Sequence, residues 1–270
     1  MEIADLHTHT SLCRHAEGTP EEFLAAALAR GEHYYGIADH CPFPADFEPS
    51  WRMTEEEFPE YRRIVRELKE KAAGSGLTVL YGIEMDWVPE RREEICAKLS
   101  AEPFDYVIGS IHCLDGFCFD DPANRSVWAQ PGMPEKIWKA YLRDLKTYVS
   151  EWDFQILGHA DLPKKFDYKP DDTPEFKRAF REIFGIMKER GIALEINVSG
   201  LYNAVREFYP SLSLLKLAKE TGLDLTYGSD AHAPAEIGRD FEAAVAWAEA
   251  AGFDAFAVFE NRRKKILPFV

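Results

Sequence analysis

Short apolar runs alternate with amphipathic segments along the whole 270-residue chain, and this alternation limits the possible folds more than any other feature. The runs cover residues 3–6, 34–38, 78–83, 106–111, 154–157, 193–196, 223–227 and 256–259. Segments with helical periodicity lie between them, at about residues 20–30, 54–73, 90–100, 134–151, 174–190, 211–221 and 240–251. Strands that alternate with helices are typical of α/β proteins with a parallel sheet. We expect one domain of this class over residues 1–270.

Polar side chains that can bind metals follow almost every apolar run. They are His7 and His9, Asp39 and His40, Glu84, His112, His159, Asn197, and Asp230 with His232. Because the C-terminal ends of parallel strands open on one face of a barrel, these side chains should converge there. His7 and His9 are two residues apart, so a strand would point both imidazoles to the same side. The pattern predicts a metal site at this face.

Seven of the eight histidines lie at or just beyond such an end, with His15 in the first loop and His33 as the exception. Any one of them could be a structural histidine with an ordinary hydrogen bond. Seven together, with Glu84 and Asp230, would need too many separate buried partners. Nitrogen and carboxylate ligands without thiolates suit zinc, iron or manganese.

The composition argues against several classes of protein. A formal net charge of -15 disfavours sustained contact with nucleic acid, because proteins that bind it carry basic patches. No apolar run approaches the roughly 20 residues that span a membrane, and the early histidine motif leaves no room for a secretion signal. The five cysteines form no CxxC pair, which favours reduced thiols in the cytoplasm. The oligomeric state stays open.

Two further segments carry structural expectations. Residues 113–132 lack a clear period, and we expect them to form a long functional loop over the site. Arg262, Arg263, Lys264 and Lys265 form a basic tetrad, which we expect on a solvated helix face rather than at a nucleic-acid surface.

The ordered set of motifs resembles the polymerase and histidinol phosphatase (PHP) superfamily, and within it the monofunctional histidinol-phosphatases. The motifs are Asp5-Leu-His-Thr-His9, His15, Ile37-Ala-Asp-His40, Gly82-Ile-Glu84, Gly109-Ser-Ile-His112, Gly158-His159-Ala-Asp161 and Gly228-Ser-Asp-Ala-His232. They span residues 5–232, which is nearly the whole chain. The resemblance to the histidinol-phosphatase branch depends on the length of the chain, on Asn197-Val-Ser-Gly-Leu-Tyr202 with Tyr209-Pro-Ser211, and on the long loops after the second and fourth apolar runs.

The resemblance implies a distorted (β/α)7 TIM-like barrel, with the active site at the C-terminal ends of its parallel strands and a trinuclear cluster of divalent metals. By motif, the ligands of the first metal would be His7, His9, Glu84 and Asp230. Glu84 would bridge to a second metal, held also by His112 and His159. The third metal would be held by His15, His40 and His232. Asp39 would orient a neighbouring imidazole.

Such a cluster suits the hydrolysis of a phosphate ester, because closely spaced divalent metals lower the pKa of a bridging water and clamp the reacting oxygens. A metal-bridging hydroxide would attack, and the acid for the leaving group would be a metal-bound water or Asp161. The candidates for binding phosphate or substrate are Arg206, Lys164, Lys165, Asn197 and Ser199. Arg206 could instead pair with Glu207 at the surface, and the Asn and Ser side chains could merely cap backbone groups.

We expect a histidinol-phosphatase, which hydrolyses L-histidinol phosphate to L-histidinol and phosphate in histidine biosynthesis. Acidic and aromatic side chains of the loop could receive the ammonium and imidazole of this substrate: Asp115, Asp120, Asp121, Phe117 and Phe119. One alternative is a PHP phosphoesterase for another small phosphomonoester, such as a nucleotide or sugar phosphate. Another is a non-catalytic metal-binding module. A zinc amidohydrolase on a related barrel would need a lysine at the end of a middle strand, and the predicted strand ends carry none.

Overall fold

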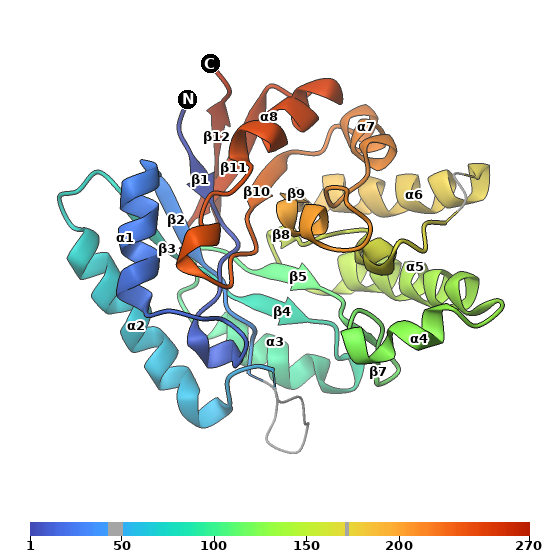
Figure 1. The fold of residues 1–270 in the computed structure, drawn as a ribbon, viewed down its shortest axis with the longest axis horizontal. Coiled ribbons are helices and arrows are strands. Elements are labelled where there is room, and N and C mark those ends of the chain that lie inside the picture. Colours follow the sequence, from blue (N-terminus) through green and yellow to red (C-terminus); the bar gives the residue numbers. More distant parts are fainter. Residues whose placement is uncertain (43–50, 171–172) are drawn as a thin grey trace.

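The computed structural model describes residues 1–42, 51–170 and 173–270, and it has an α/β fold in which helices surround parallel sheets (Figure 1). One sheet has the order β1 (Ala4–Asp5), β2 (Tyr34–Ile37), β3 (Thr78–Tyr81). The other has the order β10 (Leu225–Gly228), β9 (Ala193–Asn197), β8 (Ile156–Leu157), β5 (Ile108–Ser110), β4 (Glu84–Asp86). All neighbouring strands in these two sheets run parallel. The expectation of an α/β protein with parallel strands is confirmed.

The longer helices lie where the periodicity predicts them. They are α1 (Pro20–Arg30), α2 (Phe58–Ala72), α3 (Arg92–Ser100), α5 (Met133–Glu151), α6 (Pro174–Arg190), α7 (Leu212–Thr221) and α8 (Phe241–Ala250). α1 begins after a capping box, in which the side chains of Thr19 and Glu22 each accept a hydrogen bond from the backbone N–H of the other. Within the described residues, no helix is both long enough and apolar enough to cross a membrane.

Backbone hydrogen bonds connect the two sheets near the functional residues. The N–H of Asp230, just beyond β10, donates to the carbonyl of His7, just beyond β1, at 2.8 Å. The N–H of Glu84 donates to the carbonyl of Asp39, just beyond β2, at 2.9 Å. The polar residues that follow β1, β2 and β10 are thereby held at the same end of the sheets as Glu84.

The apolar run at residues 78–83 is interrupted at Gly82, which separates β3 from β4. The buried ring of Tyr106 fills the interior here, and a Cβ atom on Gly82 would lie 2.5 Å from Cζ of that ring. The chain changes neighbours at this point, because β3 pairs with β2 whereas β4 pairs with β5. Glu84 therefore begins a strand instead of following one, which corrects its predicted placement.

Residues 113–132 contain more regular structure than expected. A short antiparallel hairpin of β6 (Cys113–Leu114) and β7 (Phe117–Cys118) turns at Gly116, whose φ is 77°. Helix α4 (Arg125–Trp128) follows it. The hairpin places Cys113 opposite Cys118, and the two form a disulfide. The expectation of reduced thiols is wrong for this pair, whereas Cys13, Cys41 and Cys96 are free.

The basic tetrad lies in an antiparallel hairpin, so its assignment to a helix is wrong. The hairpin consists of β11 (Ala255–Glu260) and β12 (Arg263–Pro268). Asn261 and Arg262 form its turn with φ values of 50° and 60°. Lys264 pairs with Asp224 on the surface, in keeping with the expected solvated position.

Candidate metal centre

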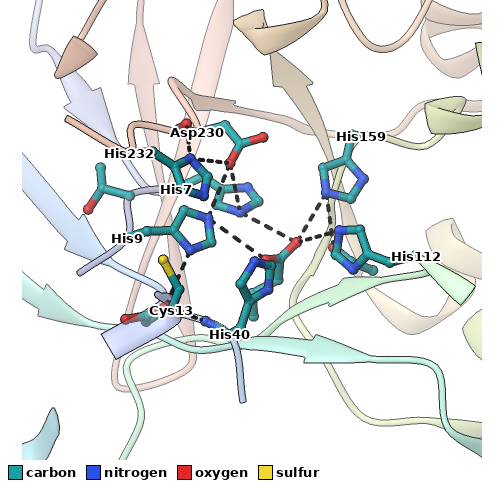
Figure 2. A network of polar contacts seen from close by, with 12 residues as sticks. His7, His9, Cys13, His40, His112, His159, Asp230 and His232 are labelled. Carbon is teal, nitrogen blue, oxygen red and sulfur yellow. Dashed lines mark hydrogen bonds and ion pairs between the residues drawn. The ribbon is translucent and has the colours of Figure 1, made fainter. Parts of the chain in front are cut away.

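The buried carboxylate of Glu84 lies at the centre of a cluster of imidazoles. Its Oε1 atom lies 3.1 Å from Nε2 of His159, 3.5 Å from Nε2 of His7 and 3.6 Å from Nε2 of His112. Its Oε2 atom lies 2.8 Å from Nδ1 of His40. Figure 2 shows these four imidazoles turned toward one another. Four separate segments of the chain therefore contribute a histidine to one carboxylate.

A second group of side chains surrounds Asp230. Its Oδ1 atom lies 3.1 Å from Nε2 of His9 and 3.8 Å from Nε2 of His7. The ring of His232 stacks on that of His9, with centroids 4.1 Å apart, and on that of His15 at 4.5 Å. The nine side chains predicted as metal ligands thus lie in one continuous cluster.

The backbone of Asp230 is in the left-handed region, with a φ of 55°. A residue other than glycine adopts this conformation at a cost of about 1–3 kcal/mol, and it persists where the surroundings fix it. The Oδ2 atom of Asp230 accepts hydrogen bonds from Nδ2 of Asn197 at 3.2 Å and from Oγ of Ser199 at 3.1 Å. These bonds leave its Oδ1 atom to face the imidazoles.

Carboxylates behind the cluster fix three of its imidazoles. Nδ1 of His7 lies 2.6 Å from Oε1 of Glu195, and Nδ1 of His112 lies 2.5 Å from Oδ1 of Asp86. Nδ1 of His9 lies 3.4 Å from Oδ1 of Asp39. Backbone carbonyls do the same for His15 and His232, whose Nδ1 atoms lie 2.7 Å and 2.9 Å from them. In the first three rings Nε2 faces Glu84 or Asp230. Metal-binding histidines are typically held in this way.

The charges of the cluster shift one another's pKa values. Burial opposes ionisation of Glu84, but His40, His7 and His112 outweigh it and hold the pKa of Glu84 well below its usual range. Burial also opposes ionisation of His112, but Asp86 and Glu84 raise its pKa to about 9. The pKa of His40 falls to about 4, because burial outweighs the attraction of Glu84. The central carboxylate is therefore ionised and attracts cations.

Several buried atoms of the cluster have no hydrogen-bond partner in the part of the chain that the structure describes, among them His7 Nε2, His159 Nδ1 and His232 Nε2. Buried polar atoms almost always have a partner in proteins. Among the sets whose ligand atoms lie within 4.8 Å of one another are His7, His9 and Asp230; His7, Glu84 and His159; and His9, His40 and His232. Divalent metals would satisfy these atoms, so the donor set and its spacing fit such ions.

The cluster opens into a cavity of about 570 Å³, which is the size of a small-molecule site. Trp51 lines it, with its ring edge-on to His40 and His112 at centroid distances of 4.9 Å and 5.6 Å. Lys165 and Arg239 also line it. Both the candidate metal ligands and cationic groups thus face the same space.

The two predicted lysines have different surroundings. Lys165 lines the cavity, and its Nζ atom lies 3.1 Å from Oδ2 of Asp120. Lys164 is only 2 % exposed and is not part of the cavity lining. Its Nζ atom contacts Oδ2 of Asp161 at 2.9 Å and Oε2 of Glu207 at 3.0 Å. The position of Lys164 is that of a structural ion pair, which differs from the expected contact with substrate.

Arg206 also lies outside the cavity lining, contrary to the expected phosphate contact. Its side chain is exposed, and its Nη1 atom donates to the carbonyl of Leu201 at 3.1 Å. The alternative pair with Glu207 is not formed either, because the carboxylate of Glu207 lies beside Lys164 and Lys169. Arg206 therefore does not supply the cationic group that was expected to bind phosphate in the cavity.

Asn197 and Asp161 are buried, and neither lines the cavity. The Nδ2 atom of Asn197 donates to Oε2 of Glu195 at 3.1 Å, so this amide supports the residues behind the cluster. Ser199 does line the cavity, and its single hydroxyl proton is shared between Oδ1 of Asn197 at 2.7 Å and Oδ2 of Asp230 at 3.1 Å. Burial raises the pKa of Asp161, although Lys164 opposes this shift.

The five residues of segment 113–132 that were predicted to contact substrate differ in exposure and position. Asp120 and Asp121 line the cavity. Phe119 is fully buried and Phe117 is half-buried against the core, while Asp115 is 82 % exposed. Of this set, the two adjacent carboxylates are therefore the ones that a substrate could meet.

Four residues that shape the site were not predicted from the sequence. Glu195 and Asp86 hold histidines, and Trp51 and Arg239 line the cavity. A signal for Glu195 was present, since it is a charged residue inside an apolar run. Asp86 lies two residues after Glu84, on the same side of the strand. The two cavity residues carry no local signal.

A buried carboxylate among imidazoles beside an open cavity is the site of a metal-dependent enzyme. The PHP domain family matches residues 5–199, and the chain belongs to this family. A probable histidinol-phosphatase from Deinococcus radiodurans is 35% identical over 243 residues, which cover 90% of this chain and 91% of the relative.

Two further comparisons agree with this assignment. The histidinol-phosphatase of Bacillus subtilis is 26% identical over 267 residues, which cover 90% of this chain and 98% of that protein. The crystal structure of histidinol phosphate phosphatase from Lactococcus lactis, complexed with zinc, L-histidinol and phosphate, has the same fold. It matches with a TM-score of 0.84 at 22% identity, over 98% of this chain and 99% of that one.

Proposed function

We propose that the chain is a histidinol-phosphatase, which hydrolyses L-histidinol phosphate to L-histidinol and phosphate in histidine biosynthesis. The observation that carries this proposal is the convergence of seven imidazoles with Glu84 and Asp230 at one cavity. Relatives that cover nine tenths of the chain bear this name. The enzyme is a phosphoric monoester hydrolase that uses divalent metals.

We infer that three metals bind in the cluster. His7, His9, Glu84 and Asp230 would hold the first, and Glu84 would share the second with His112 and His159. His15, His40 and His232 would hold the third. The grouping of His7, His9 and Asp230 within 4.8 Å supports the first of these sites. The stacked rings of His15 and His232, 4.5 Å apart, support the third. Zinc, iron or manganese would suit this set of donors.

We also infer that the two sheets close into a distorted (β/α)7 TIM-like barrel within a single domain of residues 1–270. The N–H of Leu6 donates to the carbonyl of Tyr227 at 3.2 Å, which joins the edge at β1 to the edge at β10. The N–H of Gly82 donates to the carbonyl of Ile37 at 2.8 Å, where β3 leads into β4. Counting β3 and β4 as one bent strand leaves seven strands around the ring, with the site at their C-terminal ends.

When bound, the metals would supply a water of lowered pKa and positive charge for the phosphate oxygens. The chain's own residues fix the ligands before substrate arrives. Glu195 orients His7, and Asp86 orients His112, and each carboxylate strengthens its imidazole as an electron donor. This preorganisation lowers the cost of reaching the transition state.

The cavity also offers groups that suit the two basic parts of L-histidinol phosphate. Asp120 and Asp121 place negative charge there for the ammonium and the imidazole. Burial opposes ionisation of Asp120, but Lys165 and His112 outweigh it and lower the pKa of this carboxyl. Trp51 adds an aromatic surface near the metal ligands.

The proposal is tested by assaying the purified, metal-loaded protein on a panel of phosphomonoesters. The panel contains L-histidinol phosphate, a nucleoside monophosphate, a sugar phosphate and p-nitrophenyl phosphate. We expect kcat/KM for L-histidinol phosphate to exceed that of each other ester by at least about 100-fold. The other esters would leave the carboxylates of Asp120 and Asp121 without a cationic partner. Equal rates on all members would contradict the substrate assignment.

A further inference from the structure

We propose that Arg239 binds the phosphate group of the substrate, an assignment that rests on the proposed phosphatase function. Among the described residues that line the cavity, Arg239 and Lys165 are the arginine and lysine side chains. Arg239 lies between β10 and α8, on the segment that follows Asp230 and His232. Its side chain is 14 % exposed, so its charge is largely withdrawn from bulk water. It therefore supplies the cationic group that Arg206 does not.

The backbone on both sides of Arg239 is tied to the strands that lead to the metal ligands. The N–H of Gly238 donates to Oδ2 of Asp5, in β1, at 3.0 Å. The hydroxyl of Tyr227, in β10, donates to the carbonyl of Arg239. β1 leads into His7 and β10 leads into Asp230. The base of the Arg239 side chain is thus held at a set position relative to the proposed metals.

The guanidinium is bonded to the same segment that presents Asp230 and His232. Its Nε and Nη2 atoms donate to the carbonyl of Ser229 at 3.3 Å and 3.1 Å. Its Nη1 atom donates to Oε1 of Glu236 at 2.8 Å, and Oε2 of Glu236 accepts the N–H of His232. These bonds use three of the five N–H groups of a guanidinium. Among the described residues the other two have no hydrogen-bond partner, and they are available to a ligand in the cavity.

Tyr202 holds the guanidinium from a second direction. The ring centroid of Tyr202 lies 4.3 Å from Cζ of Arg239, and its hydroxyl donates to Oδ2 of Asp240 at 2.6 Å. Tyr202 is 54 % exposed and lines the cavity, so the contact between its ring and the guanidinium lies at the open space. A ring stacked on one face of a guanidinium leaves the N–H groups at its edge free to bind an anion.

Phosphate is the ligand that this arrangement fits best. A planar guanidinium can donate two parallel hydrogen bonds to the oxygens of a phosphate, and a fixed guanidinium does so without reorganisation. Glu236 balances the charge of Arg239 while the cavity is empty. Lys165 has a flexible ammonium that contacts Oδ2 of Asp120, so it is the less rigid of the two cations.

The test is the binding of inorganic phosphate, and separately of L-histidinol, to the metal-loaded enzyme by titration calorimetry. We expect Arg239→Ala to weaken phosphate binding by about 10- to 100-fold, the range for losing hydrogen bonds to a charged group. Binding of L-histidinol, which lacks the phosphate, should change by less than about twofold. Arg206→Ala is the matched control, and it should leave both affinities unchanged.

Arg239→Lys keeps the positive charge but loses the planar arrangement of N–H donors that can bind two phosphate oxygens. It should weaken phosphate binding by a smaller factor, about 5-fold. Tyr202→Leu should also weaken phosphate binding, whereas Tyr202→Phe should preserve it. Metal content is measured for every variant. The proposal is overturned if both Arg239 variants bind phosphate as the wild type does, or if their losses match equal losses of metal or of L-histidinol affinity. A wild type that binds phosphate without hydrolysing L-histidinol phosphate would contradict the proposed function instead.

Discussion

The Oε1 atom of Glu195 lies 2.6 Å from Nδ1 of His7, and both side chains are fully buried. The other oxygen of Glu195 accepts the backbone N–H of His159 at 2.8 Å. The carboxylate also fills the space beside Gly228, where a Cβ atom would lie 2.2 Å from Oε1. One side chain on β9 therefore fixes two proposed ligands that follow β1 and β8.

Glu195→Gln should weaken metal binding by about 10- to 100-fold, the usual effect of removing the carboxylate behind a metal-bound histidine. The amide can fill the same space, so the fold should be preserved. The measurement is competition for the metal with a chelator of known affinity. Glu189→Gln on the exposed part of α6 is the control, and an equal effect of both substitutions would refute the role of Glu195.

Glu84→Gln should reduce kcat/KM for L-histidinol phosphate by at least about 1000-fold, because it removes a charge that two of the proposed metals would share. Arg206→Ala should change it by less than about twofold, since this exposed side chain is outside the cavity lining. Steady-state kinetics with matched metal content provide the comparison. Similar modest losses in the two variants would contradict the assignment of Glu84.

Lys164→Met should lower the free energy of unfolding by about 3–5 kcal/mol, because it leaves the buried carboxylate of Asp161 without its cation. Adding Asp161→Leu should recover part of this loss. Denaturant unfolding measures the effect. Lys165→Ala is the matched comparison, and it should reduce activity with little change in stability. A Lys164 variant that is fully stable but inactive would show that this lysine acts on substrate.

Glu32→Gln should stabilise the protein more at pH 8 than at pH 5. Burial and the nearby Asp5 raise the pKa of Glu32 well above its usual value of 4.5. The native state therefore keeps a proton that the unfolded chain has lost, and stability falls as pH rises from about 4.5 through the native pKa. Urea unfolding at both pH values, with Glu70→Gln on the exposed face of α2 as the control, measures the difference. An equal effect at both pH values would exclude this titration.

Much of the fold and of the proposed ligand set could be predicted because both depend on local order in the chain. The apolar runs mark the strands, and a parallel sheet brings their ends together whatever the loops do. His112 and His159 could be placed in one site for that reason. Glu195 could also have been predicted, because a charged residue in the apolar run at residues 193–196 needs a buried partner.

The remaining residues depend on how loops fold. Lys164 and Lys165 are adjacent in the short 3-10 helix Leu162–Phe166, where each residue turns by about 120°. One ammonium is therefore buried with Asp161 while the next faces the cavity, and the sequence alone does not say which. Arg239 enters the cavity through contacts with Tyr202 and Ser229 that no sequence period marks.

The central claim is that the cluster around Glu84 binds divalent metals that the hydrolysis of L-histidinol phosphate requires. The most direct test measures metal content and turnover of this ester on the same sample, before chelation, after chelation and after metal is restored. We expect about three metals per chain in the active protein, loss of turnover with the metals, and recovery with them. Turnover that persists in the metal-free protein, or less than about one metal per chain with no hydrolysis after reconstitution, would contradict the account.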